Sequence, residues 1–258
     1  MVANGRRWAI GALFLLFAGA CDSETGPDPA GDYRVRGETP RQESLYAGAL
    51  RIAENGPGYR LTWILDGGEV YSGAALYIDN VLGAVYWPGQ TPNPGFAIAI
   101  YRVNGGELSG TWLTTATEDS KTGREVLRGS PDLVGQYEIV QGEGPDGSTY
   151  SGTVQMVRQG RIHDMRWYLP DLTFVGRGLR VGDLLVVAYA RGQAPGIVAY
   201  CMTSETGKGV WSYGKARGIG TEVISRSLKK EAFGPSDIIS IESDCKTLIG
   251  GDLALGPS

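Results

Sequence analysis

Residues 45–65 read LYAGALRIAENGPGYRLTWIL, and this stretch decides the fold class. In its first half, every second residue belongs to one face of a predicted strand: Tyr46, Gly48, Leu50 and Ile52. After the turn residues 55–58 (NGPG), the alternation resumes at Tyr59, Leu61, Trp63 and Leu65. A period of two with one apolar face is typical of a half-buried β-strand, and Gly-rich links of this kind favour a hairpin. The stretch therefore predicts two antiparallel strands.

The same pattern returns about 100 residues later, which indicates an internal repeat. The matched positions keep their order along the chain: Gly31/Gly135, Tyr33/Tyr137, Tyr46/Tyr150, Trp63/Trp167, Gly73/Gly176, Tyr86/Tyr189, Tyr101/Tyr200, Trp112/Trp211 and Glu125/Glu222. We therefore expect two copies of one domain, at 31–130 and 135–226, joined by residues 130–134 (SPDLV).

About eight strands are expected in each copy, and in the first copy the pattern places them near 31–37, 45–53, 58–65, 69–77, 80–87, 96–103, 107–113 and 124–129. Nearly all links are short, so strands adjacent in sequence are expected to pair. A meander of this size removes its exposed edges by closing on itself. The predicted fold class is all-β: two tandem antiparallel up-and-down β-barrels of about eight strands each.

The spacing of glycine and aromatic residues carries a family resemblance. A meander of about 100 residues that opens Gly-x-Tyr, with Gly-x-Trp late in the copy (Gly110-Thr111-Trp112, Gly209-Val210-Trp211), resembles the compact barrels of the avidin and lipocalin superfamily. It is also similar to tandem-repeat envelope proteins of bacteria, some labelled fibronectin-binding. Tyr33 and Tyr137 stand where lipocalins carry Trp, and no residue set specifies biotin. The resemblance implies a barrel but no particular ligand.

The N-terminus carries an export signal. Arg6 and Arg7 precede an apolar stretch, residues 8–17, that fits a signal h-region and is too short to span a membrane. The following Ala18-Gly19-Ala20-Cys21 resembles the lipobox of bacterial lipoproteins, which implies a signal peptide at 1–20 and a lipid on Cys21. The alternative is an ordinary secretory signal cleaved after Ala20. Residues 21–30 are acidic and Pro-containing, so we expect a flexible tether.

Composition narrows the partners and the compartment. Loss of Arg6 and Arg7 with the signal changes the net charge from −4 to −6, which makes nucleic acid an unsuitable partner. The expected partners are the membrane, reached through the lipid on Cys21, and a protein, glycan or small apolar ligand. This places the chain on the bacterial cell envelope. There, Cys201 and Cys245 are candidates for a disulfide that would hold the C-terminal extension, 227–258, on the second barrel.

Few residues offer chemistry. His163 is the single histidine, and its strand position favours a core or pocket residue over a polar contact for a ligand or a catalytic base. Glu125 and Glu222 occupy matched positions in different copies, which favours a scaffold role such as accepting backbone N–H bonds. A nucleophile elbow, a phosphate-binding loop and a cysteine–histidine metal motif are all absent from the sequence, so no cofactor or metal is expected.

The candidate ligand-binding residues are His163, Trp167, Trp63 and Trp87. Trp63 and Trp167 are matched, so the alternative for both is a core role. Trp87 begins a Pro-rich insertion, residues 87–95, that is either a recognition loop at a barrel mouth or an inert link.

Three classes of function remain open. The preferred one is a non-catalytic envelope lipoprotein that binds a protein or a glycan. The second is a carrier of a small apolar ligand inside one or both barrels, for which small inward residues such as Gly73 and Gly176 leave room. The third is a hydrolase, which His163 alone favours.

Overall fold

The computed structural model describes residues 26–40, 44–91, 95–115, 121–214 and 218–226. The predicted signal peptide (1–20), Cys21, Cys245 and the extension 227–258 lie outside these ranges. The described chain is all-β, as predicted. Its strands are β1 (Gly31–Glu38), β2 (Leu45–Asn55), β3 (Gly58–Leu65), β4 (Val70–Ile78), β5 (Val81–Pro88), β6 (Phe96–Asn104), β7 (Glu107–Thr114), β8 (Gly123–Arg128), β9 (Gly135–Glu143), β10 (Thr153–Gln159), β11 (Ile162–Tyr168), β12 (Thr173–Val181), β13 (Leu184–Ala190), β14 (Gly196–Met202), β15 (Thr206–Ser212) and β16 (Gly220–Ser225).

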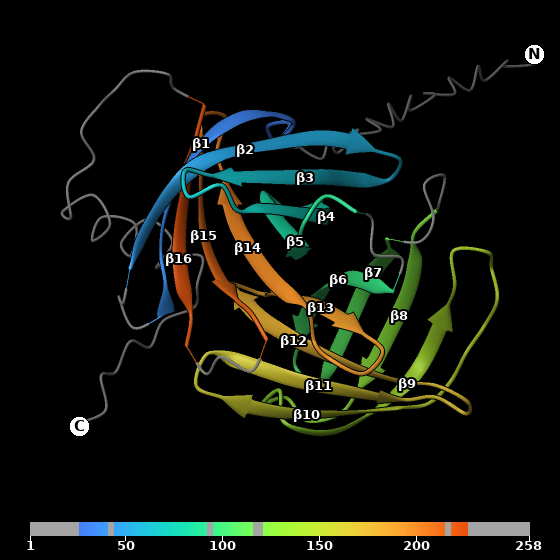
Figure 1. The fold of residues 1–258 in the computed structure, drawn as a ribbon. Helices are drawn as coiled ribbons and strands as arrows, with labels where there is room; N and C mark the ends of the chain where they lie inside the picture. The colour runs from blue at the N-terminus through green and yellow to red at the C-terminus, as the bar shows by residue number, and fades with distance from the viewer. Residues whose placement is uncertain (1–25, 41–43, 92–94, 116–120, 215–217, 227–258) are drawn as a thin grey trace, which may run out of the picture.

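The strands close into two antiparallel barrels of eight strands each (Figure 1). Barrel A has the order β1-β16-β15-β14-β5-β4-β3-β2, and barrel B has the order β10-β11-β12-β13-β6-β7-β8-β9. Closure leaves neither sheet with an unpaired edge. The predicted fold class is therefore confirmed.

The assignment of one copy to one barrel is wrong. Barrel A combines the first five strands of the 31–130 copy with the last three of the 135–226 copy, and barrel B combines the remaining strands. Each barrel still contains one set of eight repeat positions, because the strands exchanged between the copies are equivalent. The molecule thus resembles a strand-exchanged dimer fused into one chain.

The chain crosses between the barrels at two links, and these crossovers explain the role of the Pro-rich insertion 87–95. The chain passes from barrel A to barrel B between β5 and β6, and returns between β13 and β14. The Pro-rich insertion 87–95 is the first of these crossovers rather than a loop within one barrel; its residues 92–94 lie outside the described ranges. The predicted joint, 130–134, is a connection inside barrel B, where Leu133 is buried with a φ of 55°.

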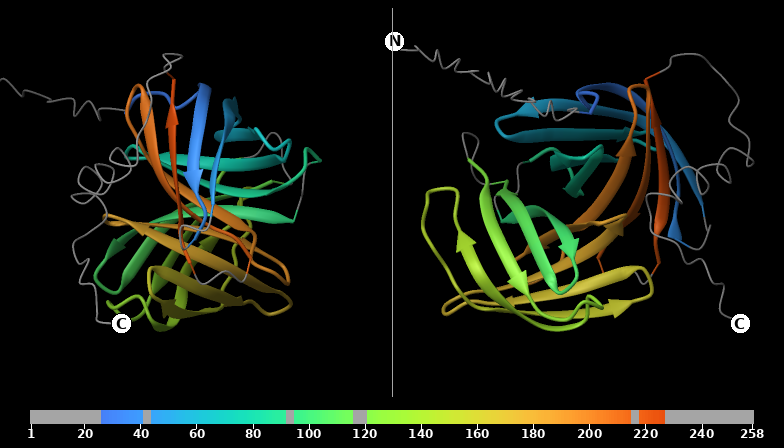
Figure 2. Two further views of the ribbon diagram at one scale, coloured as in Figure 1. Left: turned by 60° about the vertical axis from the view of Figure 1, so that its left-hand side comes forward. Right: turned by 180° about the vertical axis from the view of Figure 1, so that it is seen from behind.

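Each barrel has its own apolar interior, and a third apolar core lies between them. The interior of barrel A includes Tyr33, Leu50, Leu61, Trp63 and Tyr200. The interior of barrel B includes the matched Tyr137, Val154, Trp167 and Tyr101. The core between the barrels joins outward-facing residues of both: among others, Val81, Val85, Ile98, Ile100, Val186 and Ile197. Figure 2 shows the barrels packed against each other with β14 close to the contact.

The central strands explain why the barrels stay together. β5, β13 and β14 are buried along almost their whole length, and β6 is buried from Ala97 to Tyr101, so both faces of these segments are apolar. In contrast, β2 and β10 alternate between buried and exposed positions toward one end. An unbroken apolar run is typical of a strand covered on both sides. Burial of this outer apolar surface is favourable only when a second barrel covers it.

The last residues of the expected tether are folded. Pro29 is buried, and its carbonyl oxygen accepts a 2.8 Å hydrogen bond from Tyr33 Oη. Arg226 donates from Nη2 to the carbonyl oxygens of Asp28 (2.6 Å) and Ala30 (2.9 Å). These contacts hold residues 28–30 on the end of barrel A where β1 begins. The expectation of a flexible tether throughout 21–30 is therefore wrong for its last part, because the chain finds hydrogen-bond partners there.

Candidate functional site: a buried carboxylate and an aromatic cavity

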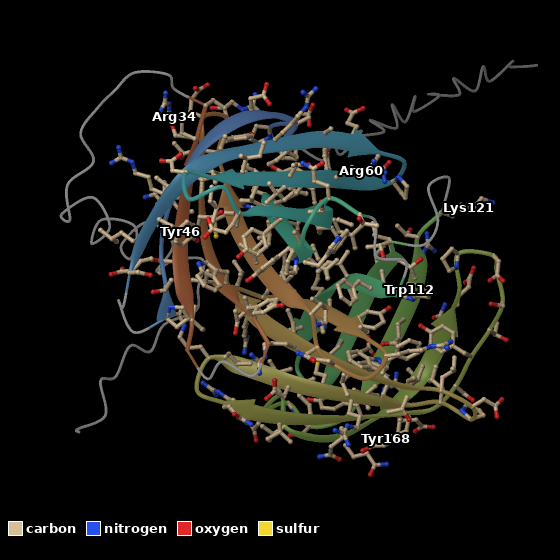
Figure 3. All side chains as sticks on the ribbon, in the orientation of Figure 1. Arg34, Tyr46, Arg60, Trp112, Lys121 and Tyr168 are labelled. Carbon is tan, nitrogen blue, oxygen red and sulfur yellow. The ribbon has the colours of Figure 1, made fainter. Side chains whose placement is uncertain are left out.

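A buried glutamate organises the interior of barrel A. Glu222 Oε2 accepts a 2.6 Å hydrogen bond from Tyr46 Oη, and Oε1 accepts a 3.1 Å bond from Trp63 Nε1. Tyr200 Oη also donates to Oε1. Three side-chain donors thus converge on one carboxyl group. Tyr46, labelled in Figure 3, comes from the first copy and Glu222 from the second, so the exchange of strands assembles this cluster.

Barrel B contains the same cluster at the matched positions. Glu125 Oε2 accepts from Tyr101 Oη at 2.6 Å and from Trp167 Nε1 at 3.2 Å, and Oε1 accepts from Tyr150 Oη at 3.0 Å. Side-chain donors, not the backbone N–H groups that we expected, satisfy both glutamates. A buried carboxylate needs such donors because desolvation otherwise makes it costly. The repeated cluster is therefore part of the barrel scaffold, as the matched positions predicted.

Burial dominates the electrostatics of both clusters. It raises the pKa of Glu125 and of Glu222 above the usual range, while the tyrosine and tryptophan donors lower both values in part. The tyrosines around them have a raised pKa for the same reason, reinforced by the nearby carboxylate: Tyr46, Tyr101, Tyr150 and Tyr200. These phenols stay protonated and can act only as donors to the glutamates.

Tryptophan rings fill the space beside the small inward residues. A side chain at Gly73 would meet the Trp63 ring at 2.9 Å, and one at Gly176 would meet the Trp167 ring at 2.8 Å. The sequence-based idea that these glycines leave room for a ligand is therefore wrong at these two positions. They instead allow the indole rings to lie flat against the barrel wall and reach the glutamates.

Open space exists farther toward the mouth of barrel A, as a cavity of about 610 Å³. Its walls are mainly aromatic: Tyr46, Trp63, Tyr71, Tyr86, Trp211 and Tyr213. Glu222 and Tyr200 line its inner part, since both are almost completely buried. Leu45 and Asp66 lie at the exposed rim. Cavities of roughly 300–1,000 Å³ with apolar walls and a few polar groups are typical of small-molecule sites.

The rings of this wall support one another. Tyr86 stacks on Tyr213 with ring centroids 5.9 Å apart, and Tyr71 meets Tyr86 edge-on at 6.0 Å. Trp211 also lines the cavity, and its matched residue Trp112 in barrel B is labelled in Figure 3. The cavity therefore combines packed aromatic rings with the carboxyl group of Glu222.

The mouth of barrel B is built differently. Phe174 stands at the position of Tyr71, and Arg191 stands at the position of Pro88. The Arg191 guanidinium lies over the Phe174 ring, 5.9 Å from its centroid. The backbone is alike at both places, because Gly89 and Gly192, which follow Pro88 and Arg191, both have a φ of 85°. Barrel B thus places its own cation over an aromatic ring at its mouth, whereas barrel A has the uncharged Pro88 at the matched position.

The four sequence-predicted ligand residues are not brought together. Trp63 lines the cavity of barrel A, whereas Trp167 belongs to the cluster of barrel B. Trp87 points outward into the core between the barrels, and its Nε1 donates to Thr91 O at 2.8 Å. Its prediction as a ligand residue is wrong because β5 is covered on its outer face by barrel B.

His163 lies inside barrel B, far from the glutamate. It stands four positions before Trp167 on β11, which corresponds to roughly 13 Å along the strand. Its Nδ1 is buried without a hydrogen-bond partner in the described part of the chain. Burial, aided by Arg158 and Arg180, lowers its pKa to about 4. The ring is neutral at pH 7 and belongs to the core, which agrees with the favoured sequence interpretation.

Sequence reasoning missed most of the cavity residues. Tyr71, Tyr86 and Tyr213 were not candidates, although Tyr86 and its match Tyr189 belong to the repeat. A useful signal was the difference between copies at Pro88 and Arg191. Cys201 lies in β14 at the partly buried outer face of barrel A. Its predicted disulfide partner, Cys245, lies outside the described residues, so that pairing stays a prediction.

In comparisons with known proteins, no family model matches the chain, and no curated protein or solved structure is significantly similar to it. In the described ranges, no helix is long and apolar enough to cross a membrane.

Proposed function

We propose that this protein is a non-catalytic binding protein of the bacterial envelope, anchored through Cys21, that holds a small ligand in the mouth of barrel A. The observation that carries the proposal is the cavity of about 610 Å³, with aromatic walls and Glu222 at its inner part. Of the three functions considered from the sequence, this favours the carrier. The ligand would occupy barrel A only, since in barrel B Arg191 already lies over Phe174 at the matched position.

The position of the anchor suits such a role. Residues 28–30 are held at the end of barrel A where β1 begins, and the cavity lies at the opposite end, beside residues 44–47 and 65–69. Four residues lie between Cys21 and Gly26, and the five residue steps from one to the other span at most about 17 Å. A lipid on Cys21 would therefore hold the end of barrel A that carries residues 28–30 near the membrane, and the cavity would open away from it.

Native mass spectrometry of the full-length protein, gently purified from its own envelope, tests the proposal. We expect an additional mass that denaturation releases. The Leu65→Trp variant should lose this mass, because Leu65 lines the cavity and a larger ring would fill it. The matched control is Leu169→Trp, which makes the same change at the equivalent position of barrel B.

The control should retain the bound mass. A mass that survives in Leu65→Trp would place the ligand elsewhere and contradict the proposal. A bare wild-type protein that also fails to bind any of the small probes described below would contradict it as well.

A further inference from the structure

The charged side chains that line the cavity in the described part of the chain are all acidic. Glu222 lines its inner part, and Asp66 and Glu69 lie nearer the mouth. Among the residues that the structure describes, no lysine, arginine or histidine lines it. Carboxylates in a low-dielectric, concave site create a negative potential that attracts cations and repels anions. The site is thus electrostatically suited to a positively charged ligand.

The walls are suited to the same charge. Tyr71, Tyr86 and Trp211 line the cavity, and an aromatic face attracts a cation within roughly 6 Å through its quadrupole. Ring-to-ring contacts between Tyr71, Tyr86 and Tyr213 hold the cage in place before any ligand enters. A preformed cage reduces the entropy lost on binding.

Barrel B supplies an independent observation, because there the chain itself places a cation at the matched position. Arg191 lies over Phe174, the counterpart of Tyr71. In barrel A the arginine is replaced by Pro88, which has no charge and a short ring. The cation site of the shared scaffold is therefore filled internally in one barrel and left for an external group in the other.

From these three observations we infer that the ligand of barrel A is a small organic cation, an amine or quaternary ammonium compound with an apolar body. Its charged group lies among the aromatic faces and the carboxyl group of Glu222, and its apolar body fills the rest of the cavity. This inference rests on the proposed function, since it names the ligand class for the same site. A bare metal ion fits less well, because no three His, Cys, Asp or Glu side chains converge within the described ranges.

Binding of matched probes to the full-length protein tests the inference. The probes are 2-phenylethylammonium and benzyltrimethylammonium as cations, 2-phenylethanol as a neutral analogue and phenylacetate as an anion. Titration is followed by calorimetry and by the fluorescence of the tryptophans, two of which line the cavity. We expect both cations to bind at least about tenfold more tightly than the alcohol, and phenylacetate to bind most weakly.

Two variants locate the charge recognition. Glu222→Gln should weaken cation binding by about tenfold or more while leaving the binding of 2-phenylethanol nearly unchanged. Glu125→Gln makes the same change in the matched cluster of barrel B and should leave both affinities unaltered. Pro88→Arg reproduces the mouth of barrel B at an exposed position, and should abolish cation binding in a protein that melts like the wild type.

The outcomes separate the inference from the proposed function. If 2-phenylethanol or phenylacetate binds as tightly as the cations, and Leu65→Trp removes that binding, the cavity is a ligand site but the inferred charge is wrong. Equal losses in Glu222→Gln and Glu125→Gln would also overturn it, because the effect would then be structural. If no probe of any charge binds and the native mass is bare, the proposed function fails together with the inference.

Discussion

Barrels A and B have the same interior and different mouths. Both contain a buried glutamate that accepts hydrogen bonds from two tyrosines and one tryptophan. At the mouth, barrel B carries Arg191 over Phe174, whereas barrel A has Pro88 beside Tyr71 and a cavity. The comparison separates what the fold requires from what a function requires. The glutamate cluster is common to both barrels, and under the proposed function the unmatched residues around it decide which barrel binds a ligand.

The largest expected effect concerns the surface that the barrels share. Ile98 is fully buried on the outer face of β6, in the core between the barrels. Ile98→Asp should lower the free energy of unfolding by about 4 kcal/mol or more, because it buries an unpaired charge. Denaturant unfolding followed by fluorescence measures the change.

Ile64→Asp is the matched control for Ile98→Asp. Ile64 is also on the outer face of a strand, but it is 52% exposed. Its replacement should change the free energy of unfolding by less than about 1 kcal/mol. Similar losses for the two variants would show that the barrels do not depend on their shared core.

An intermediate effect tests whether the two glutamate clusters are equivalent. Tyr101→Phe and Tyr200→Phe each remove one phenol that donates to a buried carboxylate. Each should cost roughly 2 kcal/mol, the usual range for a hydrogen bond to a charged group. We expect the two losses to agree within about 0.5 kcal/mol in chemical denaturation. A large loss at Tyr101 alone would show that the cluster of barrel A is loosened by its open mouth.

The effect that is smallest at neutral pH, and grows only in acid, concerns the single histidine of the sequence, His163 in barrel B. Because its pKa falls from 6.5 to about 4 on folding, the folded state favours the neutral ring. This contribution is complete above pH 6.5 and is lost as pH falls toward 4. His163→Phe places a ring where barrel A has Tyr59, and should remove this acid sensitivity.

Melting temperatures of the wild type and His163→Phe between pH 7 and pH 4.5 measure that difference. The variant should gain relative to the wild type as the pH falls. Glu125 and Glu222 change stability in the opposite direction, since their raised pKa favours the folded state at acid pH, but both proteins contain them equally. A difference that stays constant over this range would contradict a titrating His163.

Much of the fold could be predicted from local pattern. The expected strand at 58–65 matches β3, and the other seven of the first copy agree within about two residues. The predicted pairing of consecutive strands is wrong at two links, those after β5 and after β13, where the chain passes to the other barrel. Pairing of strands adjacent in sequence is a tendency and not a rule. The doubly buried runs of β6 and β13 were visible in the sequence, but a single-barrel interpretation gave no reason for an apolar outer face.

The candidate site was predicted only in part. Trp63 was a candidate because it repeats, and Glu222 was recognised as a scaffold position for the same reason. Tyr71 and Tyr213 could not be chosen, because each stands at a position that differs between the copies and nothing in the sequence places it beside Glu222. Trp87 was chosen wrongly, since the side of a strand that faces solvent depends on what covers it.

The sequence by itself determined the strands, the repeat and the number of barrels, because alternation, turn residues and Gly–aromatic spacing act over a few residues. Only the tertiary structure decided which strands share a barrel, which glutamate faces a cavity and which aromatic mouth is covered. Those features depend on contacts between residues more than 100 positions apart, such as Tyr46 with Glu222 and Trp63 with Tyr200. Equivalent strands from either copy satisfy the same local rules, so the choice between them depends on the apolar surface that the exchange buries between the barrels.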